Sequence, residues 1–129
     1  MAILRSLRFL LAADAAFCLA AGLVLALAAG TLAQLMTLPA ELLRGAGLVL
    51  LPWGLFVAWC ATRPTRALTL VVVTINLLWA ADSVALLLLG WVAPSAIGAG
   101  FILAQAAAGA AIALLQARAL PPPARLSHA

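Results

Sequence analysis

The chain has 129 residues, of which 68% are hydrophobic and 8% are charged, whereas a soluble domain is about 45–50% apolar and about 25% charged. This composition leaves too little polar surface to cover a globule in water, and its high hydrophobicity is the opposite of what disorder requires. The net charge of +4 comes from seven arginines and three acids. These arginines lie in separate groups between apolar runs rather than on one face, which argues against a nucleic-acid partner. We therefore expect a single-domain integral membrane protein whose immediate partner is the lipid bilayer.

Four apolar runs are long enough to cross a bilayer, which takes about 20 residues in a helix. They cover approximately residues 7–32, 42–61, 67–91 and 95–115. Pro39, Pro64 and Pro94 fall in the short connections between them, where helices should end. Short connections make consecutive helices antiparallel. The sequence predicts an all-α fold, a four-transmembrane-helix up-down-up-down bundle in residues 1–120, followed by a proline-rich cytoplasmic tail at 121–129.

The distribution of arginine predicts the orientation of the bundle. Six of the seven arginines precede the first run, separate the second from the third or follow the fourth: Arg5, Arg8, Arg63, Arg66, Arg118 and Arg125. The seventh, Arg44, lies near Glu41 on the opposite side. Because basic loops stay in the cytoplasm, we expect both termini there. The use of arginine without lysine in a chain rich in alanine and leucine favours a bacterial protein, so the expected location is the bacterial inner membrane.

Two acidic residues, Asp14 and Asp82, lie inside apolar runs, where ionisable groups are costly and are candidates for function. At 1.5 Å per residue, Asp14 lies about 9 Å from the cytoplasmic end of its helix and Asp82 about 12 Å from the outer end. One interpretation is structural: Arg44 pairs with Asp82, and a cytoplasmic arginine pairs with Asp14. The arginines in reach of Asp14 on that side are Arg8, Arg63, Arg66 and Arg118. The other interpretation is a protonatable carboxyl in a cavity.

The third run carries a stripe of polar residues. Thr69, Asn76 and Ser83 are seven residues apart and therefore share one helical face, with Trp79 about 60° round the helix from Asn76 and Asp82 about 60° further. Polar side chains in lipid face the bundle interior, where they hydrogen-bond across helices. The stripe indicates either such bonds or a cavity bordered by Asn76, Trp79 and Asp82. The candidate polar site consists of these three residues with Asp14 and Ser83.

The fourth run carries a second stripe, Gly98, Gln105, Gly109 and Gln116, which falls within about 40° of one face of a helix. Small residues let helix backbones approach closely. This face can pack within the protomer or against another chain. We therefore expect it to serve as a contact for a homo-oligomer or for a membrane-protein partner.

No pattern in the sequence indicates catalysis. The single histidine, His128, lies in the tail, and the motifs of zinc proteases, serine hydrolases and phosphate-binding loops are missing. Ser83 therefore has no histidine base to activate it. Cys18 and Cys60 lie within apolar runs and outside any metal-ligand spacing. The sequence predicts a protein that is not an enzyme, with no catalytic residue, no metal site and no cofactor.

The layout of the chain is similar to that of a known family. With its four spans, the loop Met36-Thr37-Leu38-Pro39 and the segment Leu43-Arg44-Gly45-Ala46-Gly47 at the start of the second span, it resembles the DoxX-like small bacterial four-helix integral membrane proteins. The resemblance implies an inner-membrane protein of a kind that is often of unassigned activity and sometimes an accessory to respiratory or redox partners. It carries over no catalytic residue.

These observations leave two functions open. The first is an accessory, assembly or structural subunit of the membrane. The second is a small transporter or a binder of a hydrophobic ligand, such as a lipid or a quinone, that uses Asp14 or Asp82. Arginine partners for these carboxylates would favour the first function, and an open cavity would favour the second.

Overall fold

The computed structural model describes residues 2–120, with side chains from Arg5 onward. Within these residues the chain forms helices α1 (Ala2–Leu27), α2 (Ala29–Met36), α3 (Ala40–Thr62), α4 (Arg66–Leu88) and α5 (Ala96–Arg118), and no strand. The four long helices are long and apolar enough to cross a membrane. The predicted all-α fold with four membrane-spanning helices is therefore confirmed. The predicted tail at 121–129 lies outside the described residues.

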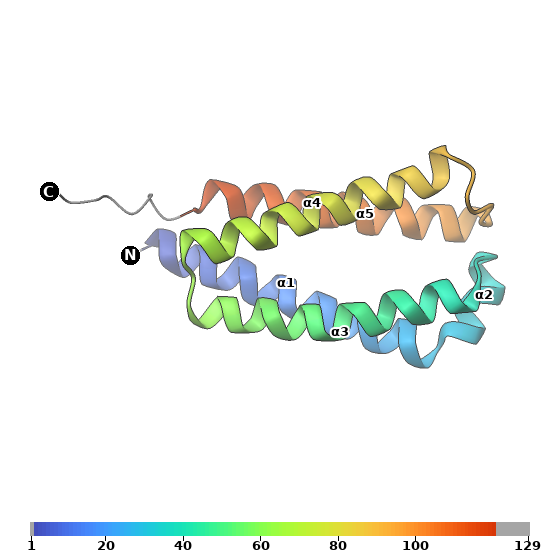
Figure 1. The fold of residues 1–129 in the computed structure, drawn as a ribbon, viewed down its shortest axis with the longest axis horizontal. Helices are drawn as coiled ribbons and strands as arrows, with labels where there is room; N and C mark the ends of the chain where they lie inside the picture. The colour runs from blue at the N-terminus through green and yellow to red at the C-terminus, as the bar shows by residue number, and fades with distance from the viewer. Residues whose placement is uncertain (1, 121–129) are drawn as a thin grey trace, which may run out of the picture.

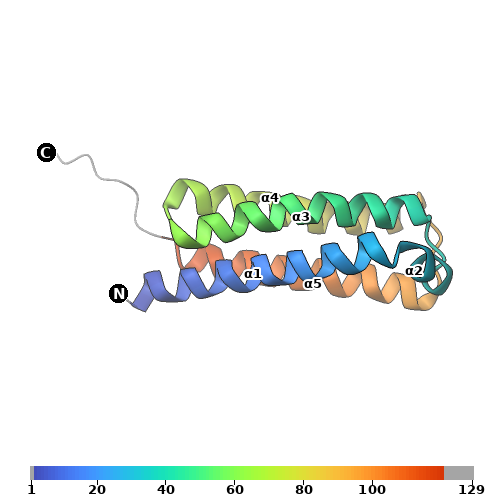
Figure 2. The same ribbon diagram turned by 90° about the horizontal axis from the view of Figure 1, so that it is seen from below.

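The four long helices run alternately in opposite directions, as Figure 1 shows. The start of α1, the connection from α3 to α4 and the end of α5 lie together at one end of the bundle, which we call the terminal end. The opposite end, where α2 lies, is the α2 end. Helix α1 packs closely along α3, and α4 packs along α5, whereas α3 and α4 make little contact. The bundle thus consists of two close helix pairs, α1/α3 and α4/α5, which face each other (Figure 1). In the view from below, the α1/α3 pair lies in front of the α4/α5 pair (Figure 2).

The first predicted span, 7–32, corresponds to two helices rather than one. Helix α1 ends at Leu27 and the chain bends at Ala28 before α2 begins. Helix α2 ends where Thr37 adopts a left-handed backbone conformation with φ of 54°. The backbone amide of Ser95 donates a hydrogen bond of 2.9 Å to the carbonyl of Met36. Residues expected to form a loop therefore form a helical turn that rests on the start of α5 and closes part of the α2 end.

The close packing of α1 on α3 depends on small residues. A Cβ added at Gly47 of α3 would lie 2.6 Å from the backbone nitrogen of Ala26 and 2.7 Å from the carbonyl oxygen of Gly22, both in α1. These distances are too short for any side chain, so the two backbones touch directly.

At the terminal end, a cluster of buried side chains closes the bundle: Leu7, Leu11, Ala15, Val57, Cys60 and Val72.

Candidate functional site

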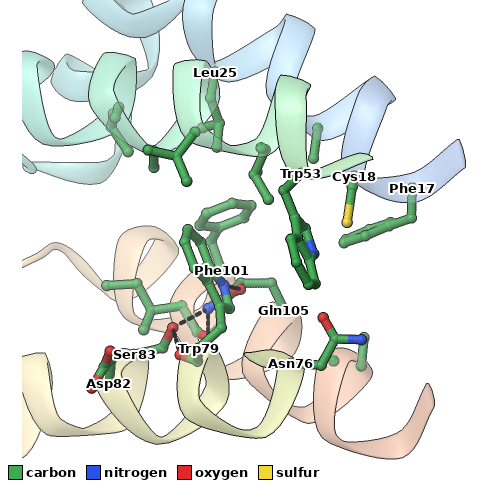
Figure 3. A pocket seen from close by; sticks show the side chains of 18 of the residues that line it. Phe17, Cys18, Leu25, Trp53, Asn76, Trp79, Asp82, Ser83, Phe101 and Gln105 are labelled. Carbon is green, nitrogen blue, oxygen red and sulfur yellow. Dashed lines mark hydrogen bonds between the residues drawn. The ribbon is translucent and has the colours of Figure 1, made fainter. Parts of the chain in front are cut away.

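A cavity of about 700 Å³ lies between the two helix pairs and extends from the level of Asp14 toward the α2 end. Aromatic side chains from all four long helices contribute to its wall: Phe17, Trp53, Trp79 and Phe101 (Figure 3). Exposed side chains of all four long helices, among them Phe17, Val49, Ile75 and Phe101, also line it, so the cavity is open to the surroundings of the bundle. Mostly apolar walls with a few polar groups, at a volume of about 300–1,000 Å³, are typical of small-molecule sites.

Two of the predicted site residues, Trp79 and Ser83, form a hydrogen-bonded network with Gln105 of α5 (Figure 3). The indole Nε1 of Trp79 donates to Oε1 of Gln105 at 2.7 Å, and Nε2 of Gln105 donates to Oγ of Ser83 at 2.9 Å. Ser83 Oγ in turn donates to the backbone carbonyl of Trp79 at 2.8 Å, and Gln105 Nε2 also donates to the carbonyl of Ile102 at 2.8 Å. Because its indole nitrogen is bonded in this way, the Trp79 ring is held as one wall of the cavity.

Two further predicted residues, Asp14 and Asn76, meet near the end of the cavity closer to the terminal end. The Asp14 Oδ2 atom accepts hydrogen bonds from Nδ2 of Asn76 at 2.7 Å and from Nε2 of Gln116 at 2.9 Å. The thiol of Cys18 donates to Asp14 Oδ1 at 3.5 Å. Asp14 is 5% exposed and Gln116 fully buried. The Asp14 carboxyl therefore joins α1 to both helices of the opposite pair.

The structure gives these carboxyl groups different partners from those that the sequence suggested. Arg44 forms its ion pair with Glu41, three residues earlier on the same helix, and not with Asp82. Neighbours at this spacing share one face of a helix, whereas α3 and α4 make little contact. Within residues 5–120, Asp82 makes no hydrogen bond or ion pair. Within the described residues, the hydrogen bonds to Asp14 come from two amides and a thiol rather than from an arginine, because those amides lie at its depth in the bundle.

Gln105 and Gln116 belong to this site, although the sequence analysis assigned them only to a packing face. Their spacing of 11 residues is close to three helical turns, so the two amides share a face. An amide side chain in lipid needs a hydrogen-bond partner, so Gln105 and Gln116 are expected to face inward for the same reason as Asn76. Gly98 at the start of the same stripe is also buried. The stripe therefore faces the interior of the protomer, and association through α5 stays a prediction.

In comparisons with known proteins, no family model matches this chain, and no curated protein or solved structure matches it. The resemblance to the DoxX-like proteins therefore stays a prediction from the sequence. What the cavity can do follows from its own geometry and chemistry.

Proposed function

We propose that this membrane protein binds a hydrophobic small molecule from the bilayer in the cavity between α1/α3 and α4/α5. The observation that carries the proposal is a cavity of about 700 Å³ with aromatic walls, open to the surroundings of the bundle. The sequence favoured an accessory or assembly subunit and kept a transporter or a lipid or quinone binder as the alternative. An open cavity lined by Asp14 and Asp82, with no ion pair from an arginine to either carboxyl group within residues 5–120, supports the alternative.

Packing and hydrogen bonding both support an occupant of this kind. Protein interiors contain few voids larger than a water molecule, and this space is open to the surroundings of the bundle, so in a bilayer a lipid chain or a hydrophobic ligand can enter and fill it. The polar groups of Trp79, Ser83 and Gln105 are bonded to one another. A hydrophobic molecule can therefore cover them without leaving a buried donor unpaired, which would cost about 1–3 kcal/mol per group. The proposed role is binding rather than catalysis.

We propose in addition that the protein is a multi-pass protein of the bacterial inner membrane with both termini in the cytoplasm. The described arginines at the terminal end are Arg5, Arg8, Arg63, Arg66 and Arg118. The α2 end carries Arg44, which is ion-paired with Glu41. This excess of positive charge supports a cytoplasmic terminal end; in that orientation the cavity extends from the level of Asp14 to the outer end of the bundle.

A matched pair of glycines on α5 allows the binding site to be tested. A Cβ added at Gly109 or at Gly100 would meet no atom within 4 Å, but Gly109 lines the cavity and Gly100 does not. Both substitutions with phenylalanine remove a helical glycine and add the same side chain. We expect Gly109→Phe to fill the cavity and to abolish binding of monoolein, a neutral single-chain probe. Gly100→Phe should bind it like the wild type.

Native mass spectrometry of the protein released from mild detergent measures the fraction that retains monoolein. Circular dichroism and gel filtration show whether both variants keep the helical fold. Equal retention by the two variants would contradict the assignment of the cavity as the binding site.

A further inference from the structure

The three acidic residues of the sequence all line the same cavity. Asp14 comes from α1, Glu41 from α3 and Asp82 from α4. No arginine in residues 5–120 lines it, although arginines outnumber acids seven to three in the chain. The cavity therefore carries the opposite sign of charge from the rest of this basic protein. Composition alone would not gather every carboxyl group around one space.

The negative charge of Glu41 is compensated by an arginine of the protein, whereas no cation within the described residues compensates Asp14 or Asp82. Arg44 forms an ion pair with Glu41 at the α2 end. Asp14 accepts hydrogen bonds from uncharged donors, and Asp82 has no partner within the described residues. A carboxylate removed from water is costly unless a cation or metal compensates it, and a carboxylate inside a membrane indicates an ion or substrate pathway. A cationic occupant of the cavity would supply the missing charge.

The aromatic walls favour the same kind of occupant. Trp53 extends into the cavity from the α1/α3 pair, and Trp79 and Phe101 extend into it from the α4/α5 pair (Figure 3). Asp82 lies next to Ser83 on α4. The face of an aromatic ring attracts a cation within about 6 Å, and tryptophan does so most strongly. This attraction is added to the hydrophobic contact that any apolar ligand would make. The site thus combines apolar contact area with negative charge.

On the basis of the proposed hydrophobic-ligand function, we infer that the cavity selects a lipophilic organic cation, such as a quaternary onium ion or a long-chain protonated amine. Uncharged and anionic molecules of the same size bind more weakly. The Asp82 carboxylate compensates the charge of the ligand, because it is exposed to the cavity opening and holds no other bond. The aromatic side chains contact the apolar groups of the ligand.

Tetraphenylphosphonium and tetraphenylborate test this inference, because they have nearly the same size and shape and opposite charge. Equilibrium dialysis of the full chain in an uncharged detergent, corrected with empty micelles, gives the dissociation constant for each ion. We expect tetraphenylphosphonium to bind at least about tenfold more tightly than tetraphenylborate, and Asp82→Asn to weaken it about tenfold. Gln34→Lys on α2 changes the net charge by the same amount at an exposed position outside the cavity and should leave binding unchanged.

The outcomes separate the inference from the function on which it rests. Asp82→Asn should fold, because the side chain is exposed and bonds to no described residue; circular dichroism and gel filtration verify this. Equal binding of the two ions, or unchanged binding by Asp82→Asn, would overturn charge selection. The hydrophobic site itself would still stand if Gly109→Phe abolished monoolein binding. Ion and monoolein binding that Gly109→Phe leaves intact would overturn the proposed function as well.

Discussion

The close contact between α1 and α3 predicts that a side chain added at Gly47 destabilises the protein. A Cβ added there would lie 2.6 Å from the backbone nitrogen of Ala26 and 2.7 Å from the carbonyl oxygen of Gly22, whereas ordinary van der Waals contact begins at 3.4 Å. Because both neighbours are backbone atoms, no side-chain rotation can relieve the clash. Gly47→Ala therefore requires the two helices to separate locally by about 0.8 Å, the difference between 3.4 and 2.6 Å.

The expected change in stability combines two effects of opposite sign. Replacing a helical glycine by alanine stabilises a helix by about 0.8–1.0 kcal/mol. Overpacking a close contact costs about 1–3 kcal/mol. We expect Gly47→Ala to lower the free energy of unfolding by up to about 2 kcal/mol. Gly45→Ala, two residues earlier on the same helix, meets no atom within 4 Å and should raise it by up to about 1 kcal/mol.

Unfolding in mixed micelles with increasing dodecyl sulfate, followed by circular dichroism, gives the free energies of the wild type and both variants. The comparison between Gly45 and Gly47 controls for helix propensity, because both residues lie in α3. If Gly47→Ala were as stable as Gly45→Ala, the direct backbone contact between α1 and α3 would be refuted. A loss of stability in both variants would instead show that the propensity argument fails in this membrane helix.

Two further predictions concern the hydrogen bond between Asp14 and Gln116 and the topology of the chain in the membrane. In a double-mutant cycle, Asp14→Ala and Gln116→Ala should be coupled by about 0.6 kcal/mol, with an upper value of about 1.7 kcal/mol, as for other hydrogen bonds between membrane helices; strictly additive unfolding free energies would argue against the bond between Asp14 and Gln116. Reporter domains fused after Leu120 and inserted at Val92 should report opposite sides of the membrane, with the first in the cytoplasm. A reporter after Leu120 that is active only outside the cytoplasm would refute the orientation inferred from arginine.

Much of the fold follows from local properties of the sequence. The third predicted span, 67–91, differs by only a few residues from α4 (Arg66–Leu88), because apolar length and the flanking prolines define a membrane helix. The bend at Ala28 could not be predicted in the same way, since the apolar run continues through it. Beyond the bend, α2 docks against the start of α5, which is a contact between segments far apart in the chain.

For the candidate site, too, the sequence indicated some features and the tertiary structure decided others. Thr69, Asn76 and Ser83 are all buried, as their shared helical face and polar character indicate. The partners of Asp14 did not follow from the sequence, because an arginine at a helix end and an amide at the same depth are both chemically suitable. The positions of α4 and α5 beside α1 decide between them, and they place Asn76 and Gln116 within hydrogen-bond distance of the carboxyl group.

The sequence by itself therefore determined the class of protein, the number of membrane-spanning helices and the inward face of α4. These features depend on composition and on helical periodicity, which are properties of each segment alone. Only the tertiary structure decided that α1 packs on α3 and α4 on α5, with a cavity between the pairs. The physical reason is that the pairing depends on how closely particular backbones approach, as at Gly22 and Gly47, and the cavity is the space that remains where the two pairs do not close on each other.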